Sequence, residues 1–175
     1  MELYNYSAQS YPRRMTASAV LMAEDEAGSV LIVKPTYRSD NKWLLVGGII
    51  EENESPLKAC KREIKEELGL ELNLAQLLYI EYCSSYENVP ESIHFIFFDL
   101  LSKQQRDAIR LPHTEIEKYR VCNQKDAYEL LAPRISKRLG LALGALCDQK
   151  IVFVIDGLVV SNKPEATIQR RKDEY

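Results

Sequence analysis

The sequence predicts an α/β fold, in which helices cover a β-sheet. Short β-rich segments fill most of the first hundred residues, one amphipathic helix interrupts them at 57–68, and a second helical region follows from residue 124. The length of 175 residues is that of one domain. We place this single domain at residues 1–161 and expect the polar segment 162–175 to be a flexible tail.

Composition excludes several classes of protein. The chain is 46% hydrophobic and 28% charged, with a net charge of −3, as in ordinary globular proteins. No apolar run approaches the roughly 20 residues of a membrane helix, and no signal peptide or basic stripe is evident. The four cysteines form no CxxC pair, which favours reduced thiols. We therefore expect a cytoplasmic protein that binds neither membranes nor nucleic acid.

The N-terminal elements are strands joined by tight turns. Residues 15–23 and 29–34 form a hairpin in which Gly28 supplies a positive φ angle. Residues 43–46 are a third strand, which the pair Gly47-Gly48 ends.

The helix at 57–68 has clear boundaries. Ser55 is the expected N-cap, Pro56 occupies the first helical position, and Gly69 supplies the stop. One apolar stripe is expected to pack on the sheet: Leu57, Cys60, Ile64 and Leu68.

The second half repeats this alternation of strands and helices. Strands are expected at 71–83 and 92–101, and residues 102–119 are mostly loop. Pro133 divides the following helical region into two helices that cover the sheet. Asp156-Gly157 joins two apolar runs as a β-hairpin. The apolar face of that hairpin predicts association into a homodimer.

The charges of the first helix are arranged against its own stability. Glu63, Glu66 and Glu67 share one side in its C-terminal half. Like charges at this spacing cost a few tenths of a kcal/mol per pair, and the helix dipole disfavours acids at this end by about 0.3–1 kcal/mol each. A solvated acidic face is one interpretation. The other is a site for a hard divalent cation such as Mg²⁺.

The residues around this helix resemble a known signature. The segment from Gly48 to Leu70 fills every fixed position of the Nudix box, G-x5-E-x7-R-E-U-x-E-E-x-G-U, in which U is a bulky aliphatic residue. The chain is thereby identified as a member of the Nudix hydrolase superfamily. One departure is Val46, where many members have proline, and it removes no chemical group.

The resemblance implies a fold and an activity. The fold is an α/β/α sandwich with a mixed β-sheet, to which this chain adds C-terminal helices and a β-hairpin. The activity is hydrolysis of a diphosphate linkage in a nucleoside diphosphate joined to another group, with Mg²⁺ or Mn²⁺ as cofactor. A polyphosphate is repelled by the acidic helix unless cations bridge the two.

The resemblance also implies roles for individual box residues. The metal ligands are Glu63, Glu66, Glu67 and the backbone carbonyl of Gly47. Arg62 is structural and pairs with Glu54 or Glu66 to hold the loop on the helix. The remaining structural positions of the box are Gly48, Glu54 and Gly69.

The general base is left open by the sequence, because some family members use a box glutamate and others a glutamate on a later loop. Glu63 is the candidate inside the box, and Glu115 is the preferred candidate outside it. Three further acids lie in the polar loops that follow strands, and any of them is also an ordinary surface acid: Glu87, Glu91 and Glu117.

Each candidate residue for binding substrate can be interpreted in two ways. Trp43 stacks on a base or packs in the core. Lys34 and Arg38, with Tyr37 between them, meet phosphates or belong to a solvated loop. His94 is interpreted as a packed or rim residue and not as a ligand.

The leading hypothesis is a Mg²⁺-dependent pyrophosphohydrolase that acts on a small-molecule nucleotide by water attack at phosphorus. A nucleoside triphosphate and a nucleoside diphosphate linked to another group are both candidate substrates. The first alternative is a non-catalytic nucleotide-sensing module. The second is a pyrophosphohydrolase acting on the 5′ end of RNA.

Overall fold

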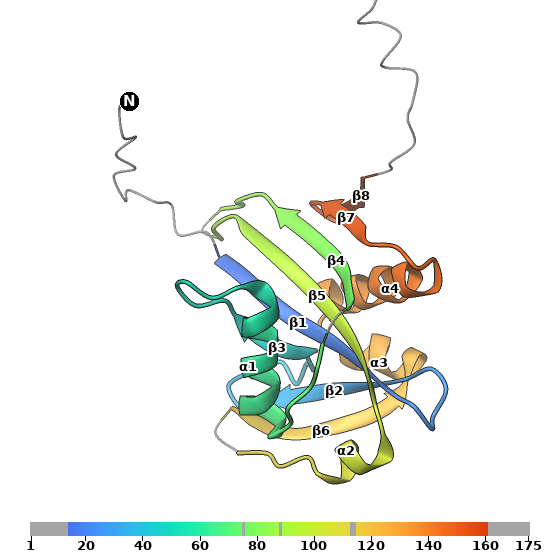
Figure 1. The fold of residues 1–175 in the computed structure, drawn as a ribbon. Helices are drawn as coiled ribbons and strands as arrows, with labels where there is room; N and C mark the ends of the chain where they lie inside the picture. The colour runs from blue at the N-terminus through green and yellow to red at the C-terminus, as the bar shows by residue number, and fades with distance from the viewer. Residues whose placement is uncertain (1–13, 75, 88, 113–114, 161–175) are drawn as a thin grey trace, which may run out of the picture.

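The computed structural model describes residues 14–74, 76–87, 89–112 and 115–160. Within them, one eight-stranded sheet lies between helix α1 on one face and helices α3 and α4 on the other (Figure 1). The elements are β1 (Arg14–Ala23), β2 (Ser29–Pro35), β3 (Val46–Ile49), α1 (Pro56–Leu68), β4 (Gln76–Cys83), β5 (Ser92–Leu101), α2 (Lys103–Asp107), β6 (Ile116–Asn123), α3 (Gln124–Leu130), α4 (Pro133–Cys147), β7 (Val152–Ile155) and β8 (Leu158–Val159). This is the predicted α/β/α sandwich.

The sheet is mixed, as the family resemblance implied. Its strand order is β6-β2-β1-β5-β4-β7-β8, and β3 pairs with the N-terminal half of β1. The pairs β1–β5 and β4–β7 are parallel, and the others are antiparallel. Strand β3 therefore lies beside the centre of the sheet and directly under α1.

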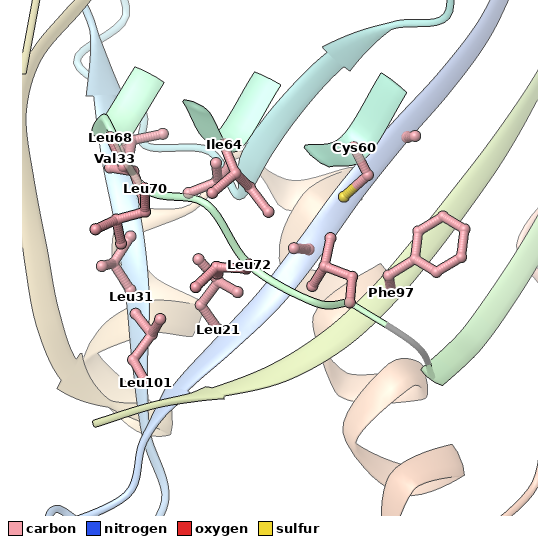
Figure 2. Packing of buried hydrophobic residues seen from close by; sticks show 14 of the residues in the cluster. Leu21, Leu31, Val33, Cys60, Ile64, Leu68, Leu70, Leu72, Phe97 and Leu101 are labelled. Atoms are coloured by element: carbon pink, nitrogen blue, oxygen red, sulfur yellow. The ribbon is translucent and has the colours of Figure 1, made fainter. Parts of the chain in front are cut away.

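The apolar stripe of α1 packs on one face of the sheet. Cys60, Ile64 and Leu68 are fully buried against side chains such as Leu21 and Phe97 (Figure 2). Burying one such aliphatic side chain contributes about 1.5–3 kcal/mol. This packing fixes the rotation of α1, so its acidic side is turned toward the strand that carries the two glycines.

The ends of α1 are those predicted from the sequence. The Ser55 hydroxyl accepts a hydrogen bond from the Lys58 amide at 3.3 Å, and Pro56 occupies the first turn. Gly69 adopts the left-handed conformation, with φ of 70°, and its amide donates to the Lys65 carbonyl. An N-cap of this kind contributes about 1 kcal/mol.

The other face of the sheet carries a second core under the C-terminal helices. Leu131, Leu139 and Leu143 pack against strand residues such as Val20 and Tyr79. Pro133 begins α4, so the predicted division of this region into two helices is confirmed.

The third strand differs from its prediction. Residues 43–46 were expected to form it, with Gly47-Gly48 at its end, but the strand is Val46–Ile49 and contains both glycines. Trp43 and Leu44 make only isolated bridges. The strand includes both glycines because Gly47, which has no side chain, permits close pairing with β1.

Two later segments were also predicted wrongly. Residues 71–74 are not part of a strand, although Leu72 and Leu74 are buried, and β4 begins at Gln76. The expected loop at 102–119 contains α2, which a Ser102–Gln105 capping box starts, and the beginning of β6. Strand β6 was missed because it is a charged edge strand with few apolar residues.

The C-terminal hairpin is confirmed, with positive φ angles at Asp156 and Gly157. Val152 and Val154 point into the core, whereas Phe153 and Leu158 are 42% and 73% exposed. Within the described residues, no helix is long and apolar enough to span a membrane. The predicted tail at 162–175 lies outside the described residues.

Candidate active site

Gly47 brings β3 into close contact with β1. A Cβ atom at this position would lie 2.2 Å from the Ala17 carbonyl oxygen, and the φ angle of 133° is one that residues with side chains rarely adopt. The Gly47 amide donates a 2.9 Å hydrogen bond to Glu67 Oε2. This bond ties the strand to the acidic side of α1.

Gly48 leaves room for a carboxylate. A Cβ atom on this residue would lie 2.4 Å from Oε1 of Glu63, a distance that real Cβ atoms do not show. The glycine therefore allows the Glu63 side chain to lie against the strand. The two adjacent glycines serve different purposes, since one permits strand pairing and the other accommodates an acidic side chain.

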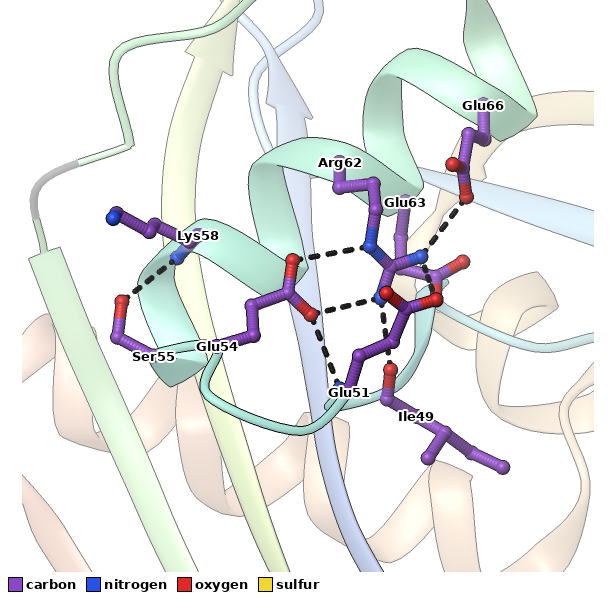
Figure 3. A network of polar contacts seen from close by, with 8 residues as sticks. All are labelled: Ile49, Glu51, Glu54, Ser55, Lys58, Arg62, Glu63 and Glu66. Carbon is purple, nitrogen blue, oxygen red and sulfur yellow. Dashed lines mark hydrogen bonds and ion pairs between the residues drawn. The ribbon is translucent and has the colours of Figure 1, made fainter.

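Arg62 connects the loop before α1 to the helix itself. Its guanidinium donates to both carboxylate oxygens of Glu54 at 3.0 Å and to the Ile49 carbonyl at 2.9 Å (Figure 3). It also contacts Glu63 at 2.8 Å and Glu66 at 2.9 Å. Both contacts expected for Arg62, to Glu54 and to Glu66, are present. The same cation holds the pKa of Glu54 below its usual value.

The three glutamates of α1 differ strongly in environment. Glu67 and Glu63 are buried, with 8% and 9% exposure, whereas the side chain of Glu66 is 58% exposed. Burial raises the pKa of Glu67 to about 8, and the charges of Glu63, Glu115 and Glu66 add to the shift. Burial also raises the pKa of Glu63, against the opposing effect of Arg62. A concentration of negative charge therefore lies at this end of the sheet.

Glu115 joins this group from a distant part of the sequence. Its carbonyl accepts a 2.7 Å hydrogen bond from the Thr36 amide, at the point where β2 and β6 meet. The charge of Glu115 contributes to the raised pKa values of Glu63, Glu67 and Tyr37. Strand pairing thus places Glu115 and Tyr37 beside the box.

The other outside glutamates lie elsewhere. Glu117 forms ion pairs with Lys34 and Lys118, and Glu91 accepts a hydrogen bond from the Tyr82 hydroxyl at 2.7 Å. Glu87 is exposed in the loop after β4. Glu115, in contrast, contributes its charge to the raised pKa values of Glu63 and Glu67.

A cleft of about 400 Å³ opens next to the two glycines. Tyr37 and Arg38 border it near Gly47, and it continues along β1 and β5 to the start of α4. The lining there consists of Thr16, Ser18, His94, Ile96, Ile135 and Arg138. A volume of this size accommodates a ligand of nucleoside dimensions.

Sequence reasoning missed the polar residues of this cleft. Thr16 and Ser18 alternate with buried alanines in β1, a pattern that any half-buried strand shows. His94 is a packed residue, as predicted, and contacts Thr16 at 2.7 Å and Ser92 at 2.9 Å. Arg138 lies 68 residues beyond the end of the box at Leu70, and no motif connects the two.

Two of the four predicted substrate contacts lie away from the cleft. Trp43 is 6% exposed in the core under α3, and the Arg120 guanidinium covers its ring at 5.5 Å. The stacking interpretation is therefore wrong for Trp43, because its hydrophobic ring is already buried. Lys34 is paired with Glu117 at 3.1 Å. Tyr37 and Arg38 do border the cleft, where Arg38 is hydrogen-bonded to Asp40.

The donor atoms of the box fit a hard divalent cation. Carboxylate and carbonyl oxygens are the ligands that Mg²⁺ prefers, and a bound cation offsets both the burial and the neighbouring negative charges that raise the pKa of Glu67. In the described part of the chain, no three acidic, histidine or cysteine side chains are already arranged around one point. The carboxylates of Glu63 and Glu66 are instead directed toward Arg62, which is hydrogen-bonded to both.

Comparison with known proteins identifies the family and the fold. The family model described as the NUDIX domain matches residues 12–140. The structure is similar to the NUDIX domain of Shewanella oneidensis NrtR complexed with ADP ribose, at 21% identity and a TM-score of 0.66 over 83% of this chain and 99% of that one. It is also similar to a MutT protein from Methanosarcina mazei, at 17% identity and a TM-score of 0.61 over 81% and 98%.

Two further similarities complete the comparison. A Caenorhabditis elegans Ap4A hydrolase has 19% identity and a TM-score of 0.60 over 77% of this chain and 98% of its own. An octanoyltransferase from Myxococcus xanthus is 30% identical over 82 residues, which is 47% of this chain and 23% of that protein. Because so little of that curated relative is matched, its name carries no argument about activity. The family model covers most of the chain, and the chain therefore belongs to the NUDIX domain family and is a member of the Nudix hydrolase superfamily.

Proposed function

We propose that this Nudix hydrolase is a Mg²⁺-dependent, or Mn²⁺-dependent, pyrophosphohydrolase that cleaves the diphosphate linkage of a nucleotide by water attack at phosphorus. One observation carries the proposal. The acidic side of α1 meets a cleft of nucleoside size at Gly47 and Gly48, so a diphosphate and the group attached to it have adjoining places.

The ligands proposed for the cation are Glu63, Glu66, Glu67 and the carbonyl of Gly47. A bound divalent cation neutralises phosphate charge and lowers the pKa of a coordinated water molecule. The Gly47 amide fixes one carboxylate oxygen of Glu67 and so orients its other oxygen. In this proposal Arg62 attaches the loop before α1 to the helix and does not contact the substrate.

Glu115 is the proposed general base. A carboxylate that binds a cation is a weak base, and Glu63 is held by Arg62. Glu115 lies on a separate loop, has no such pairing with Arg62, and shares the electrostatic environment of the box. General-base catalysis contributes about 10²–10⁴-fold.

The substrate class is a nucleoside diphosphate linked to a second group. One structural neighbour is a complex with ADP ribose and another is an Ap4A hydrolase, and both names describe this linkage. A nucleoside triphosphate is the alternative. We place the activity in the cytoplasm, where the four cysteines remain thiols; in the structure all four are free.

The second candidate function is that of a nucleotide-sensing module. The ADP ribose complex of the NrtR domain favours it, because that structure shows a NUDIX domain holding a nucleotide ligand. The intact set of box glutamates favours the enzyme instead. An RNA 5′ end is the least favoured substrate, since the net charge of −3 opposes binding of a polyanion.

A panel of nucleotides incubated with Mg²⁺ tests the proposal. We expect turnover of a diphosphate-linked nucleotide, with oxygen-18 from water in a phosphate product. Glu66→Gln should lower kcat about 10²-fold or more, because a charge-stabilising contact is lost. Glu115→Gln should lower kcat while metal affinity stays normal.

The matched control is Glu71→Gln, which removes an exposed carboxylate just beyond the same helix. Full turnover by the Glu66 variant, or no turnover by the unaltered protein, would move the sensing module to first place. Label found only in a non-phosphate product would show attack elsewhere and would overturn the pyrophosphohydrolase proposal.

A further inference from the structure

A second cavity, of about 430 Å³, lies beyond the far end of the cleft. It is open to solvent and is bordered by the end of β4, the loop that follows, the first two turns of α4 and the β7–β8 turn, and Arg134 and Lys137 on its rim are exposed. Arg138 lines both this cavity and the cleft. We call it the distal chamber.

Three cations from one helix line the distal chamber: Arg134, Lys137 and Arg138. Spacings of three and four residues place them on one side of α4. The Nζ atom of Lys137 lies beside the β7–β8 turn, 2.9 Å from where a Cβ atom on Gly157 would be. The three positive charges therefore surround the chamber from the helix to the turn.

The carboxylates of the chamber are already engaged. Glu81 is 5% exposed and accepts a 2.6 Å hydrogen bond from Arg138. Asp156 accepts bonds from the Ser84 amide at 2.7 Å and the Ser84 hydroxyl at 2.8 Å. In the described part of the chain, Arg134 and Lys137 have no carboxylate partner. The chamber therefore has a surplus of positive charge in a protein that is acidic overall.

The helix end adds to this surplus. The first turn of α4 contains no acidic residue, and Ala132 supplies no side-chain cap. The N-terminus of a helix carries partial positive charge, so cations are disfavoured there and an anion is favoured. Like charges on one helix face are also destabilising. An anion in the chamber offsets both effects.

We propose that the distal chamber binds the phosphate monoester group of a small molecule. Such a group carries about −1.5 to −2 charges at pH 7 and accepts several charge-assisted hydrogen bonds. Ser84 and Tyr86 border the same space. Two sources share this chemistry. One is a further phosphate on the nucleotide in the cleft, an assignment that rests on the proposed function, and the other is a free phosphorylated metabolite.

Titration calorimetry with inorganic phosphate, in buffer containing EDTA, tests the chamber without the box. We expect saturable binding that weakens at least tenfold when Arg134 and Lys137 are both replaced by glutamate. Lys137→Gln, a milder change, should weaken phosphate binding less. The control Lys125→Glu reverses an exposed charge on α3 and should leave phosphate binding unchanged. Glu66→Gln alters the box and not the chamber, and it should also leave phosphate binding unchanged.

The result that overturns the proposal is no phosphate binding, or equal binding by the doubly reversed variant with an unchanged melting temperature. Because no turnover is measured, this result is independent of the proposed function. Turnover of ADP-ribose and of its 2′-phosphate then separates the sources. A preference for the 2′-phosphate that the reversed variant loses identifies the substrate as the source. Phosphate binding without such a preference identifies a free metabolite.

Discussion

Replacement of Arg62 by alanine separates a structural role from a substrate-binding role. The variant removes five polar contacts. Three of them join Glu54 and the Ile49 carbonyl to α1, and the other two hold Glu63 and Glu66 within the helix. We expect lower thermal stability together with lower kcat, because the end of β3 and the loop that follows it lose their attachment to the helix.

The magnitude follows from the exposure of each partner. The side chains of Glu54 and Glu63 are 15% and 11% exposed, so their charge-assisted bonds contribute about 1.5–3 kcal/mol each at most. Glu66 is 58% exposed, and such a pair contributes about 0–1 kcal/mol. These upper limits sum to about 3–7 kcal/mol, and because the Arg62 side chain is itself 24% exposed to solvent, we expect roughly half of that sum, about 2–4 kcal/mol. At about 2–4 °C per kcal/mol, the melting temperature should fall by roughly 5–15 °C.

Differential scanning calorimetry and steady-state kinetics on the same preparations measure both effects. Arg62→Lys keeps the charge but not the forked geometry, and it should lose an intermediate amount of stability. Lys61→Ala, which removes a neighbouring cation from the same helix, is the matched control. An Arg62→Ala variant with unchanged melting behaviour and only a raised KM would refute the reasoning.

Three further predictions concern the box and the hairpin. In metal-free protein the pKa of Glu67 is raised from 4.5 to about 8, so the folded state binds more protons than the unfolded state across that range. The free energy of unfolding should therefore fall as pH rises from 4.5 to 8, and a Glu67→Gln variant with the same slope in thermal melts would contradict this. Gly47→Ala should destabilise the protein severely, since the new Cβ meets the backbone of β1, whereas Gly48→Ala should mainly displace Glu63 and reduce kcat. Equal melting temperatures for these two glycine variants would argue against the distinction. Finally, the exposed face around Phe153 predicts a homodimer, so light scattering should give two chains for the unaltered protein and one for Phe153→Lys; a single chain for both would rule the dimer out.

The two phosphate-binding sites that we propose, the box and the distal chamber, have opposite charge. Around Glu67 the protein concentrates negative charge, so a phosphate approaches only with a cation. Around Lys137 it concentrates positive charge, so a phosphate binds directly. Arg138 stands between the two regions and is neutralised by Glu81. A ligand in the cleft therefore meets a balanced ion pair there.

The sequence by itself determined the family, the acidic helix and most element boundaries. These are local properties: the box is contiguous from Gly48 to Leu70, the capping of α1 depends on Ser55 and Gly69, and the turn at Gly157 needs only its own residues. Short-range patterns of this kind are decided by neighbours along the chain, so one sequence is enough to recognise them.

The tertiary structure alone decided which distant residues join the box. The sequence made Glu115 the preferred candidate outside the box, but only the pairing of β2 with β6 places it beside Tyr37. Trp43 was open between stacking and packing until its burial under α3 settled the matter. Arg138 has no sequence motif, because its position depends on how α4 crosses the sheet. Contacts between distant segments follow from strand order and helix packing, and neither is encoded in the spacing of residues along the chain.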